Sequence, residues 1–292
     1  MNKWGQTAGV VMIAALAAWG GANLSPANGP SGSTAKESVF DRVTRTGTLR
    51  CAYILYRPEI MKDPNTGKLS GYVVDITEEI GRQLNLKVEW VTELGFGFQD
   101  VVAGLKSDRF DAACSGFVET PSHARGALFS IPIDYAPEYI YVRANDTRFD
   151  QSLTGVNAPS VKIAQIDGEA TATIAQEAFP LAARYSLPEM SDISLALEAV
   201  ATGKADAALF PIATGKDYLA RNPGKLKVLR QHPVRPWIQP VMAFEHGEHD
   251  LKYVVDATIR TLQENGFIEK TLRKYDPELD SYLLTAKPYQ IR

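Results

Sequence analysis

The chain has 292 residues and a formal net charge of −3, with 45% hydrophobic and 22% charged residues. This length is typical of two domains of about 100–150 residues each, and the composition is that of an ordinary globular protein. The small net charge gives no general attraction to nucleic acid or to an anionic membrane. Because no cluster of Lys and Arg is interleaved with aromatic residues, we expect no nucleic-acid partner.

The N-terminal segment differs from the rest of the chain. Lys3 is the only charged residue before Lys36, and residues 8–22 are nearly all small or apolar. This apolar stretch is shorter than the ~20 residues that a membrane-spanning helix needs. The pattern predicts a signal peptide over residues 1–22 and export to the periplasm, with an uncleaved anchor as the alternative. Residues 23–39, rich in Gly, Ser, Pro and Ala, are expected to form a disordered linker.

Cys51 and Cys114 are the two cysteines of the chain, and both fall in predicted core strands. They can form a structural disulfide in an oxidising compartment, or stay as buried free thiols that pack as small hydrophobic groups. The sequence leaves both alternatives open. Two distant cysteines and four scattered histidines do not have the spacing of a metal site, so we expect neither a metal nor another cofactor.

Strands and helices alternate along the first half of the chain. Apolar runs predict strands at residues 48–53, 87–91 and 110–116. Between them, Ile76, Ile80 and Leu84 stripe one predicted helix, and Val101, Val102 and Leu105 form the inner face of another. Thr120 and Pro121 predict a further helix start, with Thr as N-cap. A strand follows at residues 139–143.

The same rhythm continues in the second half. Strands are predicted at residues 161–166, 205–210, 226–229 and 237–244, and a helix is predicted to start near Glu169. Ile193, Leu197 and Val200 form the apolar stripe of another helix. A long amphipathic helix follows, with the stripe Leu251, Val254, Val255, Ile259 and Leu262. Asn265-Gly266 ends the last of these. This alternation predicts α/β architecture with right-handed βαβ units in doubly wound sheets. Ligands of such sheets bind at the carboxyl ends of the strands.

The stretch FDAACSGFVETPSHARGALFSIPIDYAPEYIYVR, at residues 110–143, resembles the central element of the family 3 periplasmic solute-binding proteins of ABC transporters, the polar amino-acid binders. TGTLR at residues 46–50, GYVVDI at 71–76 and KADAALF at 204–210 resemble further motifs of that family in the correct order. The segment TLQENGFIEKTLRKYDP resembles its C-terminal motif. The resemblance covers about residues 43–277.

The resemblance implies two doubly wound α/β lobes joined by two crossing strands, the type II periplasmic binding protein architecture. Residues 40–142 and 243–292 would form lobe 1, and residues 143–242 would form lobe 2. The lobes would close over a small-molecule ligand, and the implied partners are the membrane subunits of an ABC transporter. We expect a monomer.

Two residues that hold an amino acid in that family are different here. The position of the family's carboxylate-binding Arg is His123, and its ammonium-binding Asp aligns with Pro211. The family's hydroxyl at the end of the preceding strand becomes Val118. On an α-helix, Arg125 lies about 200° around the axis from His123, so we expect it to face away from the ligand. The sequence therefore lacks both charged anchors for a standard α-amino acid.

The expected ligand contacts are mainly aromatic. The predicted site consists of Tyr56, Phe98, Gly116, Phe117, Val118, His123, Glu169, Phe210 and Trp237. For Phe210 and Trp237, a place in the core is an equally good interpretation. Glu119 and Glu169 are the expected acids near the cleft. Glu169 also suits the first turn of a helix, where a negative charge is favourable.

These residues favour a periplasmic solute-binding protein rather than an enzyme. Its expected ligand is a small organic molecule other than a standard α-amino acid. One alternative is a periplasmic accessory or sensor protein that uses the same fold to bind another protein. A cleft filled by its own side chains would favour that alternative. A lesser alternative is an enzyme resembling cyclohexadienyl dehydratase, which would need a carboxylate-binding Arg and a placed acid or base.

Overall fold

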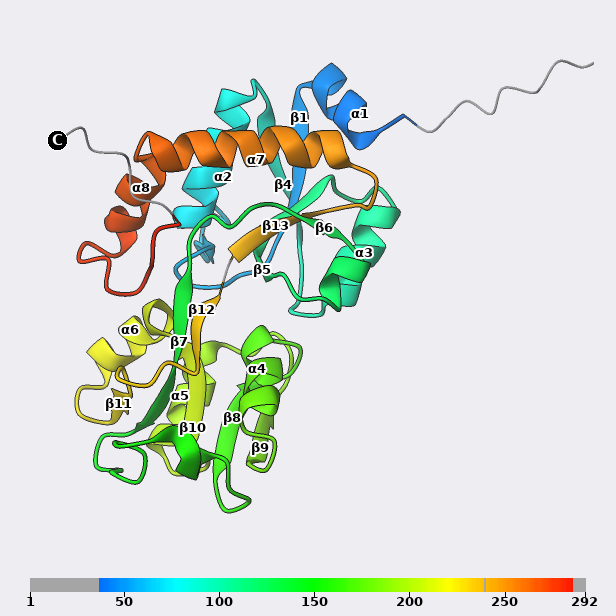
Figure 1. Ribbon diagram of the computed structural model, residues 1–292. Helices are drawn as coiled ribbons and strands as arrows, with labels where there is room; N and C mark the ends of the chain where they lie inside the picture. Colours follow the sequence, from blue (N-terminus) through cyan, green and yellow to red (C-terminus); the bar gives the residue numbers. More distant parts are fainter. Residues whose placement is uncertain (1–36, 239, 286–292) are drawn as a thin grey trace, which may run out of the picture. The chain divides into compact units, whose positions relative to one another are not determined.

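The computed structural model describes residues 37–238 and 240–285. The predicted signal peptide and most of the predicted linker lie outside these residues. The linker was expected to extend to residue 39, but Ser38 already caps helix α1 (Val39–Thr46), because its hydroxyl accepts a hydrogen bond from the backbone N–H of Asp41. Two sheets with flanking helices form two lobes (Figure 1).

The first lobe is built on a five-stranded mixed sheet in the described part of the chain, with the order β4-β1-β5-β13-β6. Its strands are β1 (Thr48–Tyr53), β4 (Lys87–Glu93), β5 (Ala112–Val118), β6 (Leu128–Phe129) and β13 (Pro240–Phe244). Strands β4 and β5 run parallel to β1, and β13 runs antiparallel to β5. A short hairpin of β2 (Met61–Lys62) and β3 (Leu69–Ser70) lies outside this sheet.

The helices of the first lobe bury one apolar stripe each. They are α1, α2 (Tyr72–Gln83), α3 (Phe98–Lys106), α7 (His249–Glu264) and α8 (Phe267–Tyr275). Ile76 and Ile80 of the predicted stripe are fully buried on α2, whereas Leu84 is the residue that ends this helix. On α7, Leu251, Val255, Ile259 and Leu262 of the predicted stripe are fully buried, whereas Val254 is half-buried. The 3.6-residue period thus identified most of the inner faces.

The second lobe is built on a six-stranded sheet of described residues with the order β11-β7-β10-β8-β9, to which β12 adds by pairing with β7. Its strands are β7 (Ala136–Arg143), β8 (Lys162–Ile166), β9 (Ala183–Leu187), β10 (Ala207–Pro211), β11 (Leu226–Val228) and β12 (Arg235–Ile238). Its helices are α4 (Ala170–Ala178), α5 (Ile193–Ala201), α6 (Ile212–Arg221) and the 3₁₀ turn η2 (Leu153–Val156).

The chain passes between the lobes before β7 and again between β12 and β13 (Figure 1). Two expected boundaries are shifted by the observed pairing. Residues 136–142 were assigned to lobe 1, but the whole of β7 pairs in the second sheet. The single strand expected over residues 237–244 is divided between the two sheets, because β12 pairs with β7 and β13 pairs with β5.

Cys51 and Cys114 form a disulfide, with their Cα atoms 5.4 Å apart and a sequence separation of 63. This settles the alternative that the sequence left open. The bond joins the neighbouring parallel strands β1 and β5, and both cysteines are fully buried in the core of the first lobe. It therefore links the two strands that lead directly into the first lobe's ligand loops.

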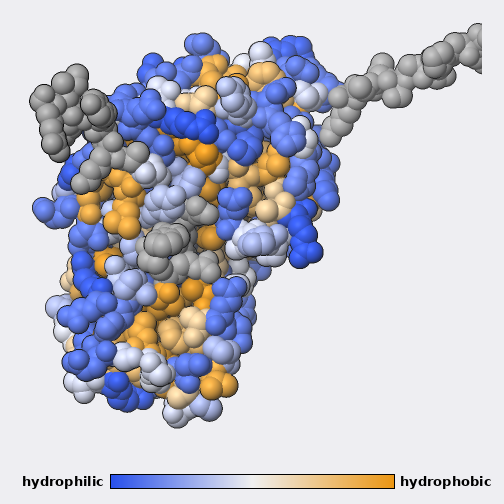
Figure 2. Space-filling model, viewed as in Figure 1, coloured by the Kyte–Doolittle hydropathy of each residue, from blue (hydrophilic) through white to orange (hydrophobic). Residues whose placement is uncertain are grey.

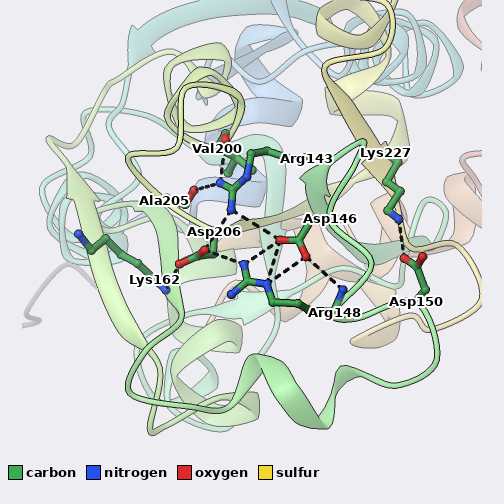
Figure 3. Close-up of polar contacts among 9 residues, drawn as sticks. All are labelled: Arg143, Asp146, Arg148, Asp150, Lys162, Val200, Ala205, Asp206 and Lys227. Atoms are coloured by element: carbon green, nitrogen blue, oxygen red, sulfur yellow. Dashed lines mark hydrogen bonds and ion pairs between the residues drawn. The ribbon is translucent and has the colours of Figure 1, made fainter.

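A group of charged residues joins several segments at one end of the second lobe by hydrogen bonds and ion pairs (Figure 3). The guanidinium group of Arg143 donates hydrogen bonds to the carbonyl oxygens of Val200 and Ala205, 3.2 and 2.7 Å away. Asp206 accepts from Arg143 at 3.1 Å and from Arg148 at 2.7 Å. Because these partners come from β7, from the loop after it and from the segments before β10, the group holds the sheet's end together.

No helix among residues 37–238 and 240–285 has both the length and the apolar character that crossing a bilayer requires. On the face in Figure 2, hydrophilic side chains cover most of the periphery of both lobes. Hydrophobic side chains gather over the middle of the lower, second lobe, and further hydrophobic groups lie on the upper, first lobe.

Candidate functional site

A cavity of about 660 Å³ lies between the two lobes. The first lobe contributes the loop after β1, the start of α3, and the end of β5 with the turn that follows. The second lobe contributes β7, the start of α4 and the end of β10. These segments lie at or beside the carboxyl ends of parallel strands, where doubly wound sheets place their ligands. The volume is within the range of ligand pockets for small molecules.

Six of the nine predicted ligand residues line this cavity: Tyr56, Phe98, Phe117, Val118, His123 and Glu169. Gly116 lies in β5 between them. Trp237 belongs to β12, but its side chain lies outside the described part of the structure.

Phe210 is not on the cavity wall, which corrects the expectation that it faces the ligand. Its side chain is fully buried in the core of the second lobe with Tyr141 and Leu197. Side chains alternate between the two faces of a strand, and the face that carries Phe210 packs against helices. The next residue, Pro211, lines the cavity instead.

The helix expected to begin at Pro121 is only a 3₁₀ turn, His123–Arg125. Thr120 still provides a cap, because its hydroxyl oxygen accepts a hydrogen bond from the His123 backbone N–H at 3.1 Å. Arg125 was expected to face away on α-helical geometry. It lines the cavity, although it is exposed to solvent. The 100° step of an α-helix does not apply to so short a 3₁₀ segment, so the angular argument was wrong.

The side chain of His123 is fixed by two contacts. Its Nδ1 lies 2.8 Å from the carbonyl oxygen of Val118, and because a carbonyl can only accept, Nδ1 is the donor. Its ring stacks on Phe98 with centroids 4.1 Å apart and planes inclined by 21°. Phe98 also packs on Phe117 and Phe129. Phe98 therefore orients His123 as well as forming part of the cavity wall.

Tyr56 and Glu169 meet across the two lobes. Glu169 caps α4, and its Oε2 accepts hydrogen bonds from the backbone N–H of Thr171, at 2.7 Å, and from the Thr171 hydroxyl. The hydroxyl of Tyr56 lies near enough to Glu169 to lower the pKa of this carboxyl slightly. Glu169 is buried, and burial raises the pKa of its carboxyl to about 8 despite these donors. At neutral pH the carboxyl group of Glu169 is thus mainly in its neutral form.

Two acids that sequence reasoning missed, Glu59 and Glu138, also line the cavity. Glu138 is fully buried, and Glu59 is half-buried. Burial is the main reason that the pKa of Tyr56 lies well above its usual value. The negative charges of Glu169, Glu138 and Glu59 raise it further. Three carboxyl groups are therefore close enough to act on a single hydroxyl.

Glu119, the other acid expected near the cleft, is exposed and does not line the cavity. Among the wall residues whose side chains the structure describes, Lys106 and Arg125 are the cations, and both are exposed. Water therefore screens their charges, whereas Glu138 and Glu169 are buried. Among the described residues, no group of His, Cys, Asp and Glu has the arrangement of a metal site.

Further polar contacts join the two lobes, one at the cavity wall and others away from it. Glu189, in the loop after β9, accepts a hydrogen bond at 2.8 Å from the N–H of Gly97, which caps α3. Lys216 of α6 pairs with Asp276 and Asp280 at 2.5 Å each. Arg230 pairs with Asp280 at 3.1 Å. Both aspartates follow α8, so the segment after α8 connects the first lobe to the second.

The sequence profile of the bacterial extracellular solute-binding proteins, family 3, matches residues 49–278. A probable amino-acid ABC transporter-binding protein of Haemophilus influenzae is 25% identical over 251 residues, which are 85% of this chain and 90% of that protein. A probable histidine-binding protein of Campylobacter jejuni is 21% identical over 224 residues, covering 76% and 82%.

The fold is also that of solved structures. The crystal structure of an ancestral amino acid-binding protein, a precursor of cyclohexadienyl dehydratase, aligns with a TM-score of 0.70 at 24% identity, over 82% of this chain and 99% of that one. The two mixed sheets described above, with their flanking helices, are thus the two lobes of a type II periplasmic binding protein fold.

Proposed function

The chain belongs to the bacterial extracellular solute-binding proteins of family 3, and on this premise we propose that it captures a small organic ligand in the cavity between its lobes for an ABC transporter in the periplasm. It is a binding protein rather than an enzyme, because the proteins of this family and the curated relatives are binding proteins of ABC transporters. We further propose that the ligand is not held as a standard α-amino acid.

The cavity carries the first part of this proposal. The described residues leave a volume of about 660 Å³ open between the lobes, whereas a cleft filled by its own side chains would favour the accessory-protein alternative. Residues from both lobes form its wall, so a bound ligand would be enclosed on two sides. Tyr56, Phe117 and the His123–Phe98 stack offer apolar and aromatic surface for the body of the ligand.

The residues at two positions support the second part. His123 stands where the family resemblance places an Arg for the α-carboxylate, and Pro211 stands where it places an Asp for the α-ammonium. Leaving a carboxylate without its charged partner in a closed site costs roughly 2–5 kcal/mol. The relatives' names concern amino acids, but these two substitutions favour a different ligand for this chain.

Calorimetry of the mature protein with the twenty standard amino acids tests this. Because both usual anchors are replaced, we expect every amino acid to bind more weakly than about 10 µM, that is, with a binding free energy less favourable than about −7 kcal/mol. Tight binding of any one of them would show that another pair of groups holds the amino-acid head. The wild-type melting curve serves as the control for correct folding.

His123 and Arg125 compete as the anchor at the turn after β5, and their alanine variants separate them. We expect His123→Ala to lower the affinity for the protein's ligand by at least about tenfold, because the stacked His123 ring is held in place on the cavity wall. Arg125→Ala should change the affinity by no more than about threefold, because its charge is exposed and screened. Titration of both variants with the same ligand is the measurement. The reverse order of losses would move the anchor to Arg125.

A further inference from the structure

One hydrogen bond joins the two lobes directly beside the cavity. The carboxylate of Glu189, in the loop between β9 and α5, accepts it at 2.8 Å from the backbone N–H of Gly97 in the first lobe. The described residues that line the cavity include Gly97 but not Glu189. Glu189 therefore connects the lobes without occupying space that a ligand would use.

Three glycines leave room for the Glu189 side chain. A Cβ on Gly95 would lie 2.5 Å from Oε1 of Glu189, and a Cβ on Gly97 would lie 3.3 Å from the same oxygen. Gly168 of the second lobe faces the same carboxyl group, since its Cβ would lie 3.5 Å from Cδ of Glu189. A methyl group on Gly95 would overlap with the carboxylate, so the first lobe can accept Glu189 in this position because residue 95 has no side chain.

The turn that carries Glu189 has a defined backbone conformation. The N–H and the hydroxyl of Ser191 both donate to the carbonyl oxygen of Pro188, at 3.1 and 2.6 Å. Met190, inside this turn, has a φ of 70°. Such a left-handed conformation is uncommon for a residue with a long side chain and often occurs at functional sites. The second lobe thus presents Glu189 to the first lobe from a locally closed turn.

Gly97 lies between two aromatic residues of the cavity wall. Phe96 packs edge-on against Tyr56, with ring centroids 6.2 Å apart. Phe98, the first residue of α3, forms the stack with the imidazole ring described above. The bond to Glu189 therefore holds the backbone segment that presents both rings to the ligand.

We propose that Glu189 is an interlobe latch, whose carboxylate enters the space beside Gly95 when the lobes close and binds the N–H of Gly97. The latch holds the lobes together over the ligand and fixes the aromatic wall. This inference rests on the proposed function and deepens it, since it assigns to ligand capture a positioning residue outside the cavity wall. A net hydrogen bond changes an equilibrium about three- to tenfold, so the ratio of closed to open molecules should depend on Glu189 by that factor.

The distance between the lobes tests the latch without a known ligand. Spin labels on Ala103→Cys of α3 and Ala178→Cys of α4, both at exposed positions, report this distance by pulsed electron paramagnetic resonance. We expect Glu189→Ala to lower the ratio of short to long distances by about three- to tenfold relative to the labelled wild type. Asp217→Ala is the matched control, because this exposed carboxylate pairs with Arg221 within α6, and it should leave the ratio unchanged.

Gly95→Ala provides a second test, because it removes the space for the carboxylate and leaves Glu189 itself in place. The atom that the new methyl group would meet is the end of a flexible side chain, so Glu189 can turn away while the first lobe keeps its structure. This variant should shift the distance ratio about as much as Glu189→Ala does. The double variant should shift it no further, since both substitutions act on one contact.

The outcomes separate this inference from the proposed function. An unchanged ratio in Glu189→Ala, or additive shifts in the double variant, would refute the latch although ligand capture stands. If Glu189→Ala opens the lobes while no compound of a broad small-molecule screen binds the wild type, the latch stands and the proposed function falls. Melting curves confirm that each variant folds, and Gly95→Ala gives the decisive reading if Glu189→Ala does not.

Discussion

Replacing Cys51 and Cys114 together with alanine is expected to lower the free energy of unfolding by about 4 kcal/mol. The disulfide closes a loop of 63 residues, and a cross-link of that span restricts the unfolded chain by about this amount in the chain-entropy model. Both cysteines are fully buried, so the smaller alanine side chains add a further cost of poorer packing. Urea unfolding of the oxidised wild type and the double variant measures the difference.

Three controls define this result. Each single variant should be about as unstable as the double variant, because either substitution breaks the bond. Reduction of the wild type should reproduce most of the loss without changing any residue. Equal stability of the oxidised and reduced wild type would mean that the disulfide contributes nothing, contrary to its position between β1 and β5.

The variant Gly71→Ala is expected to lose about 3 kcal/mol of stability or more. Gly71 caps α2 with φ 134° and ψ 164°, a conformation that is essentially restricted to glycine. A Cβ at this position would lie 2.0 Å from the carbonyl oxygen of Glu59, closer than two non-bonded atoms can approach. The loop that carries Glu59 would have to move, so affinity for the ligand should fall together with stability.

Gly67→Ala is the matched control for this prediction. Gly67 also has a positive φ, of 70°, but nothing lies within 4 Å of a Cβ built there. Alanine should therefore cost only about 1–2 kcal/mol at this position. Chemical denaturation of both variants gives the comparison. Similar losses for the two would show that the contact with the Glu59 carbonyl relaxes without cost.

Much of the fold could be predicted from hydrophobic patterns. The strands β1, β5, β8 and β10 follow from apolar runs, because most of their residues are buried, and the inner faces of α2 and α7 follow from helical stripes, because each helix buries one side. Strand β9 was missed, since its sequence ARYSL has few apolar residues and its side chains are mostly half-buried. Helix α6 was missed too, because its predominantly polar sequence gave no clear stripe.

The site was harder to predict than the fold. Glu138 had a detectable signal, because it lies in β7 on the same face as Ala136, Ile140 and Val142, and a carboxyl group on an apolar face is unusual. Glu59 had none, since its place depends on the path of a loop. The position of Arg125 depended on whether residues 121–125 formed an α-helix or a shorter turn, and the capping pattern of Thr120 is compatible with both.

The segment after α8 has a consequence for how the lobes respond to the solvent. Asp276 and Asp280 belong to the first lobe's final segment, yet they pair with Lys216 and Arg230 of the second. Asp280, Lys216 and Arg230 are at least one-third exposed, so dissolved salt weakens their attraction as ionic strength rises. The strength of the electrostatic contact between the two lobes therefore depends partly on the salt concentration of the compartment in which the protein works.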